Sequence, residues 1–289
     1  MKKIVCNDVS LYYRTAGEGE DIVLIHGLAA NHSFWRFDLL LSLAKDYRVT
    51  IFDLRGHGYS DMPPSGYTSA DMANDLFHLS KHLGITRTHL IGHSLGGVVA
   101  LHYAVLYPDR VSSLVIADSR VRTFQPTNYV RDWPNGDQAI IKLHELGFSV
   151  PEDNPESGLW LLEELASPEW RRARQKLKGS SLFIPFGGWN GGQRTAERWL
   201  ELLRTTTIKQ DLTSLAGLTI ERISMIRNPA LAIYGEHSAA KASFFGLQDY
   251  LPNCKAEIVP RAGHFYPLTQ PKLFANRIKQ FLEELKEGN

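Results

Sequence analysis

Ser94 is the residue whose surroundings point most directly to chemistry. It lies within residues 92–96, which read Gly-His-Ser-Leu-Gly, directly after the apolar run 88–91 and directly before a helix-like stretch over 95–107. Strand, sharp turn and helix in this order are typical of a nucleophile elbow, where a strained backbone pushes the serine hydroxyl outward. Glycine is needed two residues to either side, because a side chain there would clash with the strand and helix. We therefore expect Ser94 to act as a nucleophile.

A serine hydroxyl is a weak nucleophile and needs a base within hydrogen-bond reach. Among the eleven histidines, His264 is the strongest candidate because it follows the last predicted strand, 256–259. Loops after parallel strands converge on one edge of a sheet, which places this histidine near the serine. His93 should point away from the serine along the strand. His78 and His82 form an i, i+4 pair without the glutamate of a metalloprotease helix, so we interpret them as a solvated helix face.

Acyl transfer also needs two backbone N–H donors for the oxyanion of the tetrahedral intermediate. One should come from Leu95, at the start of the helix after the serine. The other should come from Leu28, which follows the buried apolar run 22–25. Gly27 lets the backbone approach a substrate closely at that point. The candidate nucleophile Ser94, the candidate base His264 and the two N–H donors together predict acyl-transfer chemistry.

The composition limits the classes of partner. The chain has 289 residues, 43% apolar and 22% charged, and a formal net charge of +1, so neither nucleic acid nor an anionic membrane is indicated as a partner. No segment approaches the ~18 consecutive apolar residues of a membrane span, and residues 1–7 lack a secretory pattern. Two cysteines, Cys6 and Cys254, fit a reducing compartment. We expect a cytoplasmic protein, and the sequence is compatible with a homodimer.

The elements that must position these residues alternate between strand and helix. Residues 3–6 and 9–14 read as a hairpin around Asn7 and Asp8. Buried apolar runs then predict strands at 21–25, 48–52, 88–91, 114–117, 230–234 and 256–259, and helical patterns at 33–43, 71–83, 95–107 and 272–285 separate them. This alternation predicts an α/β fold with a mostly parallel central sheet covered by helices on both faces.

The alternation stops over residues 120–227. Helical segments with capping signals are predicted there at 137–146, 155–166, 168–176 and 194–206. Five of the six tryptophans lie in this stretch: Trp133, Trp160, Trp170, Trp189 and Trp199. Any one of them is most simply a core residue, with Trp189 the best exception because four glycines surround it. We expect a core of residues 1–119 and 228–289 and a helical insertion at 120–227.

Four ordered motifs make the resemblance to a known family plain. His26 and Gly27, the run 53–60 (Asp-Leu-Arg-Gly-His-Gly-Tyr-Ser), the elbow at 92–96 and the pair Gly263 and His264 together resemble the α/β-hydrolase superfamily. The insertion resembles that family's helical cap. The resemblance treats Asp53 and Arg55 as a structural turn with no chemical role. His57 follows the turn-like pair Arg55 and Gly56, which favours a structural role for it as well.

The chain departs from the family pattern at the third member of the expected triad, the acid. The resemblance implies an acid three residues after Gly235, but Ser238 stands there, and a serine cannot supply a negative charge to an imidazolium. Glu236 is a carboxylate two residues early. Asp118 ends the strand 114–117, where the haloalkane dehalogenase type carries its acid. We expect the triad Ser94, Asp118 and His264.

Other roles for these acids remain open at this point. Glu236 could be the acid instead, or the site could lack one. Asp118 could cap a helix N-terminus or pair with Arg120 or Arg122.

The predicted activity is that of a carboxylesterase-like serine hydrolase that cleaves an ester or related acyl compound through an acyl-enzyme. The tryptophan-rich insertion suggests an apolar or aromatic small-molecule substrate. No metal or organic cofactor is expected. Dehalogenation is not expected, because those enzymes use a carboxylate nucleophile. Three alternatives remain: a carbon–carbon bond hydrolase or lyase on the same triad, a perhydrolase or haloperoxidase-like side activity, and a small-molecule receptor without turnover.

Overall fold

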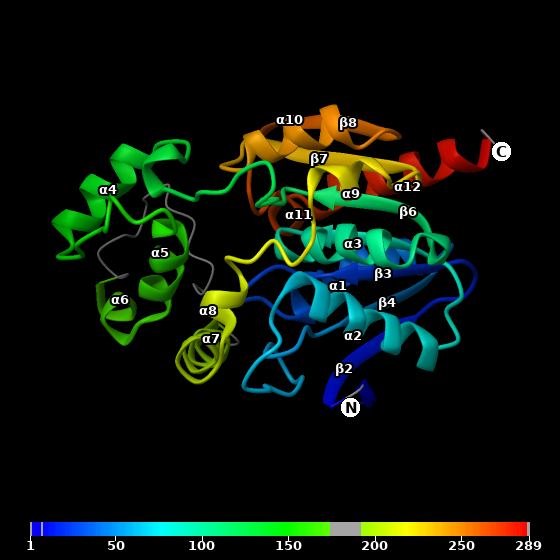
Figure 1. Cartoon of the computed structure of the whole chain (residues 1–289), viewed down its shortest axis with the longest axis horizontal. Coiled ribbons are helices and arrows are strands. Elements are labelled where there is room, and N and C mark those ends of the chain that lie inside the picture. Colours follow the sequence, from blue (N-terminus) through cyan, green and yellow to red (C-terminus); the bar gives the residue numbers. More distant parts are fainter. Residues whose placement is uncertain (1, 7, 174–191, 288–289) are drawn as a thin grey trace.

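An eight-stranded sheet forms the centre of the computed structural model, which describes residues 2–6, 8–173 and 192–287 (Figure 1). Its strands are β1 (Lys2–Cys6), β2 (Val9–Ala16), β3 (Asp21–Ile25), β4 (Arg48–Phe52), β5 (Thr88–His93), β6 (Val111–Ala117), β7 (Ala230–His237) and β8 (Cys254–Gly263). They lie side by side in the order β1-β2-β4-β3-β5-β6-β7-β8. Only the β1–β2 and β2–β4 pairs are antiparallel, so the predicted mostly parallel sheet is confirmed.

Parallel strands explain the continuous apolar runs of the sequence. Along β3, Ile22 and Leu24 pack into the core on one face of the sheet, whereas Val23 and Ile25 pack into the core on the other. Both faces are therefore dry, and alternation between apolar and polar residues is lost. Because β3, β5, β6, β7 and β8 all run in the same direction, the loops after them meet at one edge of the sheet.

Helices cover both faces of the sheet. On one face lie α1 (Phe37–Leu43) and α12 (Pro271–Glu287), and on the other lie α2 (Ser69–His82), α3 (Leu95–Leu106) and α10 (Lys241–Tyr250). Helix α2 begins with a capping box in which Thr68 and Asp71 exchange hydrogen bonds, which satisfies N–H groups of its first turn. Short elements complete the core: η1 (His32–Phe34), η2 (Pro108–Arg110), α9 (Ile220–Ser224) and α11 (Tyr266–Thr269).

The helix predicted over 33–43 is shorter than expected. The side chain of Asn31 accepts a hydrogen bond from the Ser33 N–H and starts a single 3-10 turn, η1. Trp35 then takes an extended backbone (ψ 92°), which ends that turn, and the α-helix begins only at Phe37. A local side-chain cap thus competed successfully with the helical pattern.

The segment between β6 and β7 is helical, as its sequence indicates. It contains η3 (Val130–Asp132), α4 (Gly136–Glu145), α5 (Ser157–Ala166), α6 (Pro168–Ala173), α7 (Gly192–Thr205) and α8 (Ile208–Asp211), which lie beside the carboxyl edge of the sheet at the left of Figure 1. Trp170 and Leu161 belong to a small apolar core of this segment, whereas Trp199 of α7 packs into the main core. The domain boundaries at 119–120 and 227–228 stay a prediction, and Trp189 lies outside the described residues.

None of the described helices combines the length and the apolar composition needed to cross a bilayer.

Candidate active site

The turn that carries Ser94 has the strained geometry expected of an elbow. Ser94 joins β5 to α3 with φ 55° and ψ −122°, a backbone conformation that is rare for a residue with a side chain. A Cβ on Gly92 would come within 2.2 Å of the Gly96 carbonyl oxygen, and a Cβ on Gly96 within 2.1 Å of the Ile25 carbonyl oxygen. Glycine is therefore required at both positions, for the steric reason inferred from the sequence.

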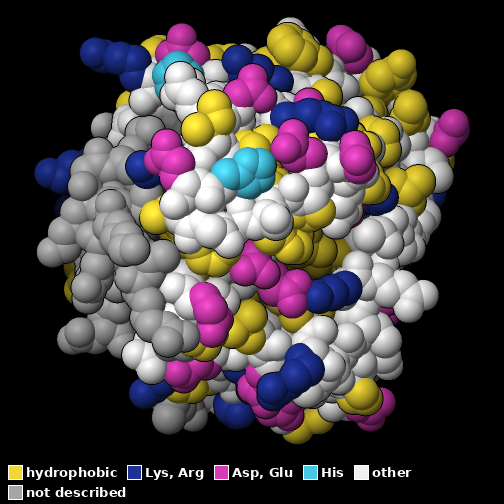
Figure 2. Space-filling model, turned by 90° about the vertical axis from the view of Figure 1, so that its left-hand side faces the viewer, with side chains coloured by type: hydrophobic (Ala, Val, Ile, Leu, Met, Phe, Trp, Pro, Cys, Tyr) yellow, Lys and Arg dark blue, Asp and Glu magenta, His cyan; other side chains and the backbone are white. Residues whose placement is uncertain are grey.

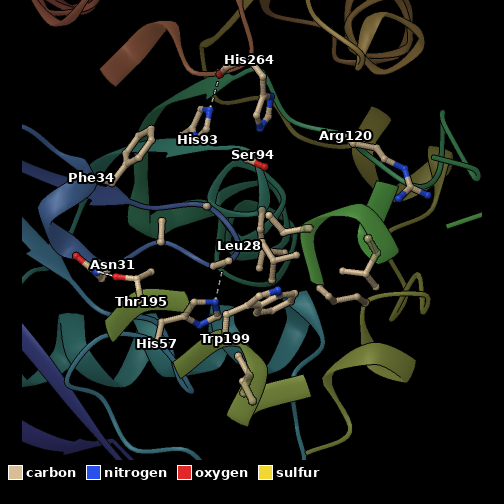
Figure 3. A pocket seen from close by; sticks show the side chains of 18 of the residues that line it. Leu28, Asn31, Phe34, His57, His93, Ser94, Arg120, Thr195, Trp199 and His264 are labelled. Carbon is tan, nitrogen blue, oxygen red and sulfur yellow. Dashed lines mark hydrogen bonds between the residues drawn. The ribbon is translucent and has the colours of Figure 1, made fainter. Parts of the chain in front are cut away.

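His264 and Asp118 meet at this edge although 146 positions separate them. Nδ1 of His264 lies 2.7 Å from Oδ1 of Asp118, which follows β6 directly and is fully buried. Figure 3 shows the imidazole of His264 beside the hydroxyl of Ser94, with the two side chains pointing toward one another. The three residues that we expected to form the triad are thus brought to one place.

The Asp118 carboxylate is held by three donors. Besides His264, the Ser238 hydroxyl donates to Oδ1 at 2.6 Å and the Gly235 N–H donates to Oδ2 at 2.8 Å. Burial alone would raise the pKa of Asp118, but the hydrogen bonds and the imidazole outweigh burial and keep the pKa below its usual value. The carboxylate is therefore ionised at neutral pH and suited to orient an imidazole. Ser238 stands at the position where the resemblance implies an acid, and its hydroxyl donates to the carboxylate of Asp118 instead.

The other roles considered for these acids are not those that the structure shows. Glu236 is exposed, and its Oε2 accepts the Arg261 N–H at 2.6 Å. Arg120 and Arg122 both pair with Glu156. Asp118 is therefore neither a partner of these arginines nor in competition with Glu236 for the histidine.

His93 points away from the serine, as expected, and supports the loop of the base. Its Nε2 lies 2.8 Å from the His264 carbonyl oxygen, and its ring stacks on Phe34 at 4.6 Å between centroids (Figure 3). Burial, with a smaller contribution from the neighbouring His264, lowers the pKa of His93 to about 3. A neutral ring with a proton on Nε2 can donate to the carbonyl and hold the backbone of His264 in position.

The two expected oxyanion donors border the same cavity as the serine. Leu28 and Leu95 both line it together with Ser94. Leu95 is the first residue of α3, so its N–H has no acceptor within the helix. Gly27 lies against the elbow, since a Cβ there would come within 2.9 Å of the Ser94 Cβ. The backbone before Leu28 can approach the serine only because that side chain is absent.

Residues of the run 53–60 hold the loop that carries Leu28 through hydrogen bonds. His57 Nε2 accepts the Ala29 N–H at 3.2 Å, and the other ring nitrogen lies 2.8 Å from the Arg55 carbonyl oxygen (Figure 3). The hydrogen bond from Ala29 fixes the tautomer, because Nε2 must be unprotonated to accept it. Ala29 has φ 54°, a conformation that a residue with a side chain keeps only when neighbours hold it there.

Two further contacts join these loops. His26 Nε2 accepts the Leu54 N–H at 3.1 Å, and the His32 N–H donates to Oδ1 of Asp53 at 2.6 Å. From the sequence we gave Asp53 no chemical role and considered His57 structural. In the structure both residues accept hydrogen bonds from the loop that carries Leu28, the expected oxyanion donor, and the signal that pointed to this contact was their common run.

The cavity over Ser94 has a volume of about 1160 Å³. Its wall is largely apolar: leucines of α5, Trp199 of α7, Phe34 and Val98 line it. Such a space suits a small molecule with an apolar body. In the described part of the chain, no group of three His, Cys, Asp or Glu side chains is arranged to hold a metal ion. The expectation that no cofactor is needed stays a prediction.

The fold and this edge of the sheet define a class of protein. The family model of the α/β hydrolase fold matches residues 22–271, and the chain belongs to that family.

Three similar proteins illustrate its breadth. The chain is 26% identical to a Bacillus subtilis protein provisionally named 2-succinyl-6-hydroxy-2,4-cyclohexadiene-1-carboxylate synthase, with 94% of this chain and 95% of that protein covered. It is 27% identical to the pimeloyl-[acyl-carrier protein] methyl ester esterase of Pectobacterium atrosepticum, over 95% and 99%. Among solved structures, the carboxylesterase CesB of Bacillus subtilis matches with a TM-score of 0.70 and 20% identity, over 97% and 90%.

Proposed function

We propose that this protein is a serine hydrolase that cleaves a carboxylic ester or a related acyl compound of a small, largely apolar molecule. The hydrogen bond of 2.7 Å between Asp118 and His264, beside a serine on a strained elbow, is the observation that carries the proposal. It supplies the oriented base that a serine nucleophile requires. The apolar cavity and the esterase-named relatives support the substrate class.

The reaction begins when His264 Nε2 takes the proton of the Ser94 hydroxyl and the oxygen attacks the ester carbonyl carbon. The ionised Asp118 stabilises the imidazolium through Nδ1. The N–H groups of Leu28 and Leu95 stabilise the oxyanion. The intermediate collapses, the carbon–oxygen bond to the alcohol breaks, and His264 protonates the departing alcohol.

The second half repeats these steps with water. His264 takes a proton from water, the hydroxide attacks the acyl-enzyme, and the bond to the Ser94 oxygen breaks as His264 returns the proton to it. The acid product leaves and the free enzyme is restored.

A fluorophosphonate probe and p-nitrophenyl esters test the proposal together. We expect covalent labelling of Ser94 in the wild type and none in S94A, with ester hydrolysis lost in the same variant. Folded wild-type protein that takes no label and hydrolyses no ester would contradict it. The missing acid at position 238 was the only feature that favoured a receptor, and the hydrogen bond that His264 donates to Asp118 argues against that reading.

A second candidate is carbon–carbon bond cleavage or elimination on the same residues. The full-length similarity to a protein named as a synthase favours it. Parallel assays with p-nitrophenyl esters and vinylogous diketones separate the two chemistries.

We also propose a cytoplasmic location. It rests on two free thiols, Cys6 and Cys254. Burial raises the pKa of Cys6 to about 12 and that of Cys254 to about 11, so both behave as inert, small apolar groups.

A further inference from the structure

Two arginines share one carboxylate in the wall of the cavity. Arg120, three residues after β6, donates to both oxygens of Glu156 at 2.8 Å, and Arg122 donates to Oε1 of the same residue. Glu156 directly precedes α5, so the cluster joins the core to the helical segment. All three side chains line the cavity, and Figure 3 shows Arg120 across it from Phe34. The cluster contains two positive charges and one negative charge, so it carries a net charge of +1.

The hydrogen bonds show which of the two guanidinium groups keeps donors that are free to bind a ligand. Arg120 also donates from Nε to the Gln125 carbonyl oxygen at 3.0 Å and from Nη2 to the Pro126 carbonyl oxygen at 2.8 Å, so each of its nitrogens is engaged. Among the described residues, Arg122 donates to Glu156 alone, from Nη1. Within the part of the chain that the structure describes, its Nε and Nη2 have no acceptor.

The edge formed by Nε and Nη2 is the edge that this protein uses elsewhere to bind carboxylates. Arg48 binds Asp21 through these two nitrogens at 2.6 and 2.7 Å. Arg55 binds Asp75 in the same way, at 2.6 Å for both. The parallel pair of donors matches the two oxygens of a carboxylate. Arg122 has the same edge, 27% exposed as a side chain, in the wall of a cavity.

The charge of the cavity wall differs from that of the outer surface. On the face that carries α4 and α6, acidic and basic side chains are interspersed (Figure 2). The described cavity wall instead holds six arginines against two acidic residues, Glu156 and Asp211: Arg14, Arg36, Arg120, Arg122, Arg194 and Arg198. Two of the six, Arg36 and Arg198, are paired with Asp38 and Glu201 outside the wall, so the wall still carries an excess of positive charge. Low-dielectric walls of one charge sign raise the local concentration of ligands of the opposite sign. A partly buried guanidinium that shares its carboxylate with a second arginine strengthens that effect because it lacks full hydration.

We propose that the substrate carries a carboxylate at a distance from its ester group, and that Arg122 binds this carboxylate through Nε and Nη2. Arg122 is then a specificity-determining residue. Arg120 binds both oxygens of Glu156, so that this carboxylate neutralises only one of the two guanidinium groups. This inference rests on the proposed function, because it places the ester carbonyl at Ser94. The substrate has an apolar middle, which the leucines of α5 contact, and an anionic end.

Matched ester pairs test the proposal. One member of each pair is the mono-p-nitrophenyl ester of a linear dicarboxylic acid, and the other is the p-nitrophenyl ester of the monocarboxylic acid with the same number of carbons. A series of chain lengths finds the span between Ser94 and Arg122. At the best length we expect the wild type to prefer the anionic ester in kcat/KM by roughly 10- to 100-fold, the range for a hydrogen-bonded charged pair.

The variants shift this preference in opposite directions. R122Q should abolish the preference, R122K should keep part of it, and E156Q should increase it by releasing a competing carboxylate. R131Q is the matched control, because Arg131 is exposed, donates to the Glu152 carbonyl oxygen at 3.0 Å and is not among the residues that line the cavity. It should alter the preference by no more than about twofold. A general loss of folding would lower kcat/KM for both esters and lower the preference in E156Q as well.

Calorimetric titration with the linear dicarboxylates reads the same site without turnover. Binding that R122Q abolishes, in a protein that neither hydrolyses esters nor reacts with the fluorophosphonate, would remove the proposed function and keep only the carboxylate site at Arg122. Ester hydrolysis with no preference at any length, or a preference that R122Q leaves intact, would overturn the inference and keep the proposed function.

Discussion

Ser238 donates a hydrogen bond of 2.6 Å to Oδ1 of Asp118, the same carboxylate oxygen that lies 2.7 Å from Nδ1 of His264. The Ser238 hydroxyl in turn accepts the Ala240 N–H at 2.9 Å, so its proton is directed at the carboxylate. The position where the resemblance implies an acid therefore supports the carboxylate of Asp118, which directly follows the neighbouring strand β6.

The first prediction concerns the choice of acid. Asp118→Asn keeps the shape but removes the charge that orients His264, and we expect kcat to fall by roughly 10⁴-fold. Glu236→Gln is the matched control: Glu236 is exposed and bonds only the Arg261 N–H in the described structure, so kcat should change by less than about threefold. Steady-state kinetics on both variants decide which carboxylate acts as the acid. Loss of activity in Glu236→Gln with full activity in Asp118→Asn would assign the acid the other way.

The second prediction is that the acid can be moved. In the double variant D118N/S238D, a carboxylate stands at position 238, next to the strand end that now carries an amide. We expect kcat to recover by at least about tenfold over D118N alone. The single variant S238D places two carboxylates side by side, which raises the pKa of one of them and shifts the acid limb of the pH–rate profile upward. A profile identical to that of the wild type would show that position 238 does not contact Asp118.

The third prediction separates two glycines near the site. Gly96→Ala places a Cβ within 2.1 Å of a backbone oxygen of β3, which cannot move without shifting the strand, and we expect a loss of about 3 kcal/mol or more in the free energy of unfolding. Gly263→Ala is the control beside His264, because a Cβ there meets nothing within 4 Å. Urea unfolding of both variants measures the difference. Equal stability of the two would contradict the packing of the elbow.

The fourth prediction concerns His57 as a positioning residue. His57→Leu removes the acceptor of the Ala29 N–H, and we expect kcat to fall by about tenfold with little change in KM, because the loop of Leu28 loses its anchor. His57→Gln can accept the same hydrogen bond and should recover most of the loss. A change in KM alone, or equal damage in both variants, would indicate general loosening of the cavity instead.

The fifth prediction is a pH dependence of stability. Burial, with the neighbouring His26 second, lowers the pKa of His57 to about 3, against 6.5 in the unfolded chain. Between these values only the unfolded chain binds the proton. The stability is therefore complete above pH 6.5 and falls, as the pH is lowered below it, by about 1.4 kcal/mol per pH unit for each such histidine.

His93, whose pKa is also lowered to about 3, contributes in the same window. Urea unfolding at pH 7, 6 and 5 should show the decline. His57→Gln has no proton to gain and should show a shallower slope, whereas an unchanged slope would exclude His57 as a contributor.

Much of the fold followed from local pattern. The apolar runs were continuous because β3 to β7 are buried on both faces, and the strand–turn–helix around Ser94 is specified within a few residues. Contacts within one turn involve side chains that are neighbours in the chain, so a local sequence pattern can predict them. Helix starts followed less directly from the pattern, as the late start of α1 at Phe37 shows, because the side-chain cap at Asn31 competes with the helical pattern.

By itself the sequence pointed to Ser94 as the candidate nucleophile, to His264 as the candidate base, and to a short set of carboxylates that could serve them. Only the tertiary structure decided that Asp118 meets His264, that Ser238 holds the carboxylate, and that Arg122 shares Glu156 with Arg120. These contacts join residues far apart in the chain. Their geometry depends on the register of neighbouring strands and the packing of whole helices, which no local run of residues encodes.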